Sequence, residues 1–113
     1  SRRIGSRRFA SMIYVIAEIE LVDGNRDEFV THFRANVPNV LAEEGCLEYT
    51  PTLDLQTELT AQPPARGKCL TVVESWESLK ALQAHLVAPH MVTYREKVKG
   101  MVVKTTLRVL HPA

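Results

Sequence analysis

The stretch MIYVIAEIEL, from Met12 to Leu21, decides the fold class of this chain. Its valine, isoleucine and tyrosine residues predict a first strand. In a sheet covered on one face only, apolar and polar side chains alternate along each strand. The first half of this strand is apolar on both faces instead, with Ile13, Val15, Ala17 and Ile19 on one face and Tyr14 and Ile16 on the other.

The remaining elements follow from hydrophobic spacing and from glycine and proline breaks. They are a helix between the turn at 23–25 and Gly45, kinked or briefly broken at Pro38; strands over 46–55 and 68–76, joined by a polar loop; helical segments over 78–87 and 89–99; and a last strand over 101–110. This β-α-β-β-α-β order predicts an α+β, ferredoxin-like fold with a four-stranded antiparallel sheet and its helices on one face.

The second sheet face needs a cover that the helices cannot supply. The last strand, MVVKTTLRVL, is also apolar on both sides. Burying one aliphatic side chain contributes about 1.5–3 kcal/mol, so a bare face would forgo several such contributions. A second copy of the chain is the simplest cover, and we expect a homodimer whose sheets face each other.

Composition and charge exclude several classes of protein. The chain has 113 residues, 45% hydrophobic and 24% charged, as in a single soluble domain. Residues 1–11 hold four arginines and no acid, and we expect them to be a disordered extension of a domain over 12–113. That domain is mildly acidic, which argues against nucleic acid as a partner. Its longest apolar run, Met12 to Ala17, is too short for a membrane span or an export signal, so a cytoplasmic protein is expected.

Few residues outside one segment indicate chemistry. Cys46 and Cys69 are not in CxxC spacing, and the expected hairpin register places them near residues 75 and 52, so both should be free thiols. The chain contains no glycine-rich phosphate loop and no G-x-S-x-G motif. The acids at 18, 20, 43 and 44 are expected to be solvated.

The segment WESLKALQAHLVAPHMVTYR, Trp76 to Arg95, concentrates the residues that can bind or react. His85 lies beside the apolar face formed by Leu82 and Leu86. It is either a hydrogen-bonded core histidine or an acid/base group in an apolar pocket. His85 and His90 are five residues apart across Pro89, which is not the i, i+4 spacing of a helical metal site, so no metal is expected.

The segments EGCLEY (Glu44 to Tyr49) and VVESWESLKALQAHLVAPHMV (Val72 to Val92) resemble the antibiotic biosynthesis monooxygenase family. The resemblance covers residues 12–110 in the same element order. It implies a ferredoxin-like chain paired into a dimeric α+β barrel. It also implies cofactor-free oxygenation of polycyclic phenols or quinols, in which the electron-rich substrate itself activates oxygen; the family also has a haem-degrading branch.

Carried over position by position, the resemblance implies a pocket-lining role for Trp76. His85 and His90 match histidines of the quinol-oxidising type, and Arg95 matches an arginine of the polyketide-oxidising type. The asparagine and tyrosine of that second type are replaced by Val72 and Leu82. The strand-one asparagine of the haem-degrading branch has no counterpart.

These observations predict a cofactor-independent monooxygenase that oxidises a phenolic, quinol or polycyclic aromatic molecule with molecular oxygen. His85 would accept the phenol proton, and Arg95 would stabilise the developing negative charge. The expected substrate-binding residues are Trp76, His90, Phe33, Met91 and Tyr94. The alternatives are a non-catalytic ligand-binding or stress-response protein on the same fold, and a haem-binding protein.

The expected homodimer can be tested by sedimentation or light scattering at micromolar concentration. The mass should be about twice the 12.7 kDa of one chain, because a second copy covers the apolar face of the sheet. A monomer at these concentrations would contradict the prediction.

Overall fold

The computed structural model describes residues 11–113, so residues 1–10 of the expected extension lie outside the described residues. The elements are β1 (Ile13–Leu21), α2 (Arg26–Leu41), β2 (Cys46–Thr52), β3 (Cys69–Trp76), α3 (Leu79–Leu86), α4 (Pro89–Val98) and β4 (Val102–Leu110). No helix within the described residues is long and apolar enough to cross a membrane.

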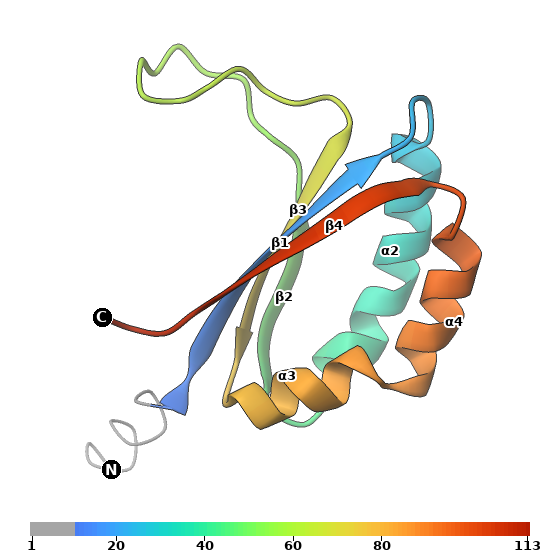
Figure 1. Ribbon diagram of the computed structural model, residues 1–113, viewed down its shortest axis with the longest axis vertical. Coiled ribbons are helices and arrows are strands. Elements are labelled where there is room, and N and C mark those ends of the chain that lie inside the picture. The colour runs from blue at the N-terminus through green and yellow to red at the C-terminus, as the bar shows by residue number, and fades with distance from the viewer. Residues whose placement is uncertain (1–10) are drawn as a thin grey trace.

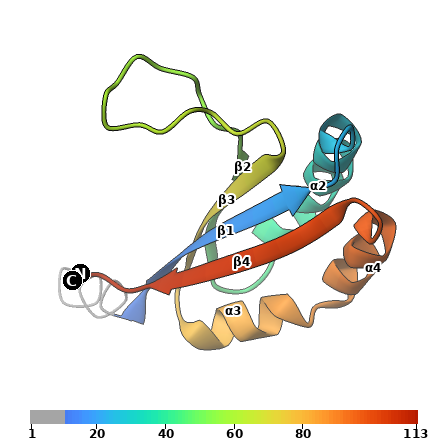
Figure 2. The same ribbon diagram turned by 45° about the horizontal axis from the view of Figure 1, so that its top comes forward.

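The sheet has the strand order β2-β3-β1-β4, and all neighbouring strands are antiparallel. β1 and β3 form its centre, where Val15 pairs with Glu74 and Ala17 with Val72. The helices lie on one side of this sheet (Figures 1 and 2). The predicted ferredoxin-like α+β fold is therefore confirmed.

Two local expectations differ from the structure. α2 continues through Pro38, so the brief break, one of the two alternatives expected there, does not occur. Pro38 lies in the last turn, so its ring removes only the hydrogen bond to the carbonyl oxygen of Arg34, and its own carbonyl oxygen still accepts from Ala42 N at 3.2 Å. β2 ends at Thr52 rather than at Leu55, because the chain leaves the sheet there and turns into the 53–68 loop.

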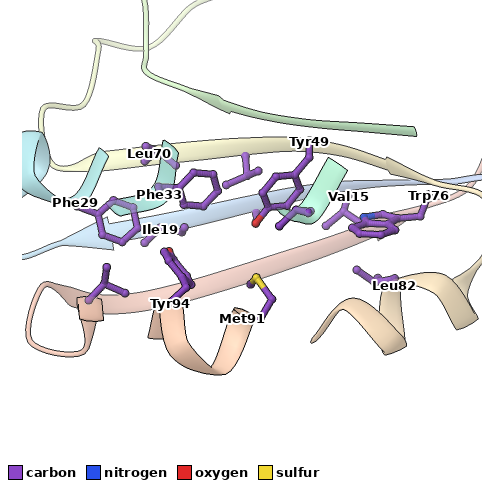
Figure 3. Packing of buried hydrophobic residues seen from close by; sticks show 14 of the residues in the cluster. Val15, Ile19, Phe29, Phe33, Tyr49, Leu70, Trp76, Leu82, Met91 and Tyr94 are labelled. Carbon is purple, nitrogen blue, oxygen red and sulfur yellow. The ribbon is translucent and has the colours of Figure 1, made fainter. Parts of the chain in front are cut away.

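Alternate residues of β1 form the floor of the hydrophobic core. Val15 is fully buried and Leu21 is 2% exposed, whereas Glu18 and Glu20 are solvated, as expected. α2 contributes Phe29 and Phe33 from above this floor. Figure 3 shows the core side chains filling the space between the sheet and the helices, including Tyr49, Leu70, Trp76, Leu82, Met91 and Tyr94.

The face of the sheet that points away from the helices also carries apolar side chains. Tyr14 is 41% exposed and pairs with Leu110, which is 44% exposed. Half-buried Ile16 pairs with Val73 on the same face. The two-sided apolar pattern read from the sequence is thus present on the folded chain.

The 53–68 loop projects away from the body of the molecule (Figure 1). Its base is held by Arg66, whose Nε donates to Asp54 Oδ2 at 2.8 Å and whose Nη1 donates to Glu18 Oε1 at 3.2 Å. The hydrogen bonds from Arg66 lower the pKa of Asp54 to about 2. Farther out, the side chains of Leu55 and Leu59 are exposed.

Both cysteines are free, as predicted. Cys46 pairs with Trp76 at one end of β3, one residue from the expected register because of an irregularity between Cys46 and Glu48. Cys69 lies at the other end of β3 and is therefore out of reach. Burial, with a smaller effect of the Glu43 carboxylate, raises the pKa of Cys46 to about 11. It remains a neutral thiol at physiological pH.

The turn into β2 allows no side chain at Gly45. Its φ is +82°, and a Cβ built there would lie 2.7 Å from Cβ of Ala81 on α3. Gly45→Ala should cost about 2–4 kcal/mol, from the left-handed backbone conformation plus overpacking. Gly24→Ala is the matched control, because its φ is +80° but nothing lies within 4 Å. Urea unfolding should show a smaller loss for Gly24→Ala; equal losses would contradict the close contact.

Candidate active site

A cavity of about 300 Å³ lies between the helices and the helix-facing side of the sheet, beside β4. Most of its wall is apolar or aromatic, which is typical of a small-molecule site. The lining side chains that can hold an aromatic ligand or move a proton are Phe33, Tyr49, Glu74, His85, Met91, Tyr94 and Arg95.

His85 is placed by α3. The helix begins after Ser78, whose hydroxyl accepts from Ala81 N at 3.1 Å and caps the first turn. His85 then faces inward in the last turn and is 2% exposed. Its ring lies 4.7 Å from the Trp76 ring and 5.4 Å from the Tyr49 ring, centroid to centroid. The rings of Trp76 and Tyr49 therefore pack against the imidazole and hold it at the cavity wall.

A carboxylate from another segment binds this imidazole. Glu43 Oε2 lies 2.8 Å from Nδ1 of His85 and 2.7 Å from Nε2 of His90. Burial lowers the pKa of His85, and the Glu43 carboxylate partly opposes that effect. His85 is therefore a neutral imidazole at neutral pH, which can accept a proton.

Glu74 supplies a second buried ionisable group. It is 4% exposed, and its Oε1 accepts from Trp76 Nε1 at 3.0 Å. Burial raises the pKa of Glu74 to about 7, although the hydrogen bond from Trp76 favours the charged form. This carboxyl group thus exchanges its proton near neutral pH, as acid/base groups in active sites do.

Three aromatic rings form one wall of the cavity. Phe33 stacks on Tyr49 with ring centroids 5.5 Å apart, and Tyr94 meets Phe33 edge-on at 5.6 Å. Figure 3 shows these rings and Met91 facing one another between the sheet and α4. Burial raises the pKa of both tyrosines, so their hydroxyl groups stay protonated. The wall offers flat apolar contacts and uncharged hydroxyl groups to a ligand.

The predicted site residues divide into two groups. Phe33, His85, Met91, Tyr94 and Arg95 line the cavity together. Trp76 packs behind His85 and holds Glu74, but it does not line the cavity. His90 is on the other side of Glu43, at a groove between α2 and α4.

Arg95 lies at the exposed end of the cavity wall. Its Nη2 donates to the carbonyl oxygen of Leu86 at 2.6 Å, which ties α4 to the end of α3. It forms no ion pair with a carboxylate within the described residues. Its charge contributes to lowering the pKa of His85 and opposes the burial effect on Tyr94.

Sequence reasoning missed three residues of the site: Glu43, Tyr49 and Glu74. The expectation that Glu43 is solvated was wrong, because its side chain is 13% exposed and is held by two histidines. Glu74 lies two residues from Trp76 in β3, so strand alternation places both on the helix-facing side. This alternation could have predicted from the sequence that Glu74 faces the site. No pattern in the sequence indicated that Glu43 does so.

The residues described by the structure contain no group of three or more His, Cys, Asp and Glu side chains suited to hold a metal ion.

The antiparallel sheet with its helices on one face defines a protein of the ferredoxin-like α+β class, and its aromatic-lined cavity with ionisable groups is suited to bind a small molecule. Residues 12–97 match the model of the family described as antibiotic biosynthesis monooxygenase. The chain belongs to this family.

A probable quinol monooxygenase from Escherichia coli K12, YgiN, is 41% identical over 103 residues, covering 89% of this chain and 98% of that protein. This similarity supports a monooxygenase of the family.

Solved structures show the same fold. A protein from Pseudomonas aeruginosa, PA3566, has a TM-score of 0.77 at 20% identity and covers 93% of this chain and 97% of its own. A putative antibiotic biosynthesis monooxygenase from Nitrosomonas europaea has a TM-score of 0.75 at 16% identity, with 91% of each chain covered. At these identities the likeness concerns the fold alone.

The raised pKa of Glu74 predicts a pH-dependent stability. The folded chain holds this proton up to about pH 7, whereas the unfolded chain loses it near 4.5, the ordinary pKa of a glutamate. The contribution is therefore fully present below pH 4.5 and is lost as the pH rises through 7, by roughly 3 kcal/mol. Glu74→Gln cannot ionise, so its unfolding free energy relative to wild type should rise over this range.

Urea unfolding at several pH values measures this difference. The matched control is Glu48→Gln on the neighbouring strand, whose side chain is exposed. A difference between Glu74→Gln and wild type that does not change with pH would contradict the buried, protonated carboxyl group.

Proposed function

We propose that this protein is a cofactor-independent monooxygenase that oxidises a phenolic, quinol or polycyclic aromatic molecule with molecular oxygen. The observation that carries the proposal is a neutral, buried histidine in the wall of an aromatic-lined cavity. Membership of the family and the similarity to the probable quinol monooxygenase of Escherichia coli support it.

The cavity favours a compact substrate. Its volume of about 300 Å³ is at the lower end of the range for small-molecule sites. Phe33, Tyr49 and Tyr94 offer ring faces and edges, and Met91 adds a polarisable apolar contact. A quinol of one or two rings fits this description better than a larger polycyclic substrate.

In the proposed reaction, Nε2 of His85 accepts the proton of a phenolic hydroxyl. The phenolate then gives one electron to oxygen, and the resulting aryloxyl radical and superoxide combine to form a carbon–oxygen bond. Cleavage of the oxygen–oxygen bond with loss of water leaves a quinone. One oxygen atom enters the product and the other leaves as water, so the substrate is the reductant.

Two further groups assist this proposed reaction. Arg95 brings a positive charge to the cavity, where it stabilises the phenolate and the superoxide as they form. Glu74, with a pKa of about 7, can return a proton when the oxygen–oxygen bond breaks. The apolar wall keeps water away from the radical pair.

We also propose that two copies pair through the open sheet face. Tyr14, Ile16, Val73 and Leu110 form an apolar patch there. Exposed apolar patches of this kind mark interaction sites, and a two-fold axis lets the same patch cover itself. Pairing would place the two sheets face to face, with the helices outside.

Replacing the proposed base should reduce catalysis more than stability. His85→Ala is expected to lower the rate of quinol-dependent oxygen consumption by about 10²–10⁴-fold. His90→Ala should lower it less, because His90 does not line the cavity. An oxygen electrode with a series of one- and two-ring quinols gives the rates, and urea unfolding of each variant gives the stability.

His32→Ala is the control, because His32 does not line the cavity and its Nε2 lies 3.8 Å from Glu28 Oε1 on the same helix. If His85 were a core residue alone, His85→Ala would lose about 1–3 kcal/mol of stability through the lost hydrogen bond to Glu43. Its rate per folded molecule would then equal that of wild type, which would contradict the catalytic role. Quinol binding without oxygen uptake by the wild-type protein would favour a ligand-binding protein instead.

A further inference from the structure

Glu43 joins two histidines that approach it from different helices. His85 comes from α3, His90 from α4, and Glu43 from the turn between α2 and β2. Both ring nitrogens lie within 2.8 Å of the same carboxylate oxygen, Oε2. The side chains of His85, Glu43 and His90 are 3%, 13% and 26% exposed. The three groups therefore lead from buried His85 at the cavity wall toward solvent.

The direction of these hydrogen bonds determines the tautomer of His85. An ionised carboxylate oxygen can only accept, so Nδ1 must carry the hydrogen. In a neutral imidazole the other nitrogen, Nε2, then has a free lone pair. Nε2 has no hydrogen-bond partner within the described residues, and the ring lines the cavity. The opposite tautomer would place a hydrogen on Nε2, and the free lone pair of the ring would then lie on Nδ1, facing Glu43 instead of the cavity.

His90 anchors the same carboxylate from the solvent side. Its Nε2 also donates to Oε2, because that oxygen cannot donate to it. Two donors from two helices leave the carboxylate little freedom to rotate away from His85. His90 also lines a groove of about 180 Å³ between α2 and α4, whereas Glu43 lines neither that groove nor the cavity.

We propose that Glu43 is the positioning residue that makes His85 a base, by holding its Nδ1–H tautomer and stabilising the imidazolium, with His90 anchoring Glu43. This inference rests on the proposed function. In the step concerned, the substrate O–H bond breaks, its electron pair stays on the phenolate, and a new Nε2–H bond forms. The Nδ1–H bond is kept, and the carboxylate offsets the positive charge of the ring.

Other ionisable groups around His85 also act on its imidazolium form, which Glu43 stabilises. His90 and Arg95, both on α4, disfavour the imidazolium, whereas Glu43 favours it. Glu74 on β3 lines the same cavity, and Tyr49 on β2 contacts the ring as an uncharged phenol. Removing the Glu43 carboxylate should therefore lower the basicity of His85.

The main test compares Glu43→Gln with Glu44→Gln, the same change at the adjacent exposed glutamate. Glu43→Gln should lower kcat by at least about tenfold and leave KM for the quinol within about twofold, because Glu43 acts through His85. The pH at which kcat/KM rises to half its plateau should move down in Glu43→Gln. It should stay unchanged in Glu44→Gln.

A second measurement does not depend on turnover. ¹⁵N NMR of the histidine rings in the wild-type protein should show His85 with its hydrogen on Nδ1 at neutral pH. The Nδ1–H population should fall in Glu43→Gln and not in Glu44→Gln. Circular dichroism and urea unfolding of each variant separate these effects from loss of the fold.

The outcomes distinguish the two proposals. If the wild-type protein consumes no oxygen with quinols but His85 shows the Nδ1–H tautomer that depends on Glu43, the proposed function fails and the positioning role stands. If the wild-type protein is active and Glu43→Gln matches it in kcat and pH profile, the positioning role is overturned. An Nε2–H tautomer of His85 in the wild-type protein would overturn it as well.

Discussion

β1 lies at the centre of the sheet, and the rest of the structure depends on the alternation of its side chains. Its helix-facing residues, from Ile13 to Leu21, form the floor on which α2, α3 and α4 pack. Ala17 and Ile19 are also part of the cavity floor. The same strand presents Tyr14 and Ile16 on its other face. One strand thus serves the core, the cavity and the proposed subunit contact, because its two faces point in opposite directions.

The candidate active site carries ionisable groups at a cost in stability. Burial disfavours the charged forms of both Glu74 and His85. It therefore raises the pKa of Glu74 and lowers the pKa of His85. Each group is held by one hydrogen bond, from Trp76 to Glu74 and from His85 to Glu43. Since a domain is stable by only about 5–15 kcal/mol, such buried groups are retained where they serve chemistry.

Hydrophobic spacing and short motifs in the sequence predicted the segment that holds the site, but not all of the residues that form it. The helical spacing of His85 beside Leu82 and Leu86 indicated an inward-facing histidine, and the structure buries it. Trp76 was expected to line the pocket, but it supports the pocket from behind through its contacts with His85 and Glu74. Glu43 was expected in solvent, because an acid at the end of a helix is usually solvated.

The sequence by itself determined the order of the elements, the antiparallel sheet, the separation of the two cysteines and the face on which His85 lies. These properties depend on spacings of two, three and four residues and on turn residues, which act over short range. The tertiary structure decided the hydrogen bond between Glu43 and His85, which are 42 residues apart. It also decided the depth of Glu74 and the position of Trp76. Such contacts arise from how helices pack on a sheet, and no local periodicity encodes that packing.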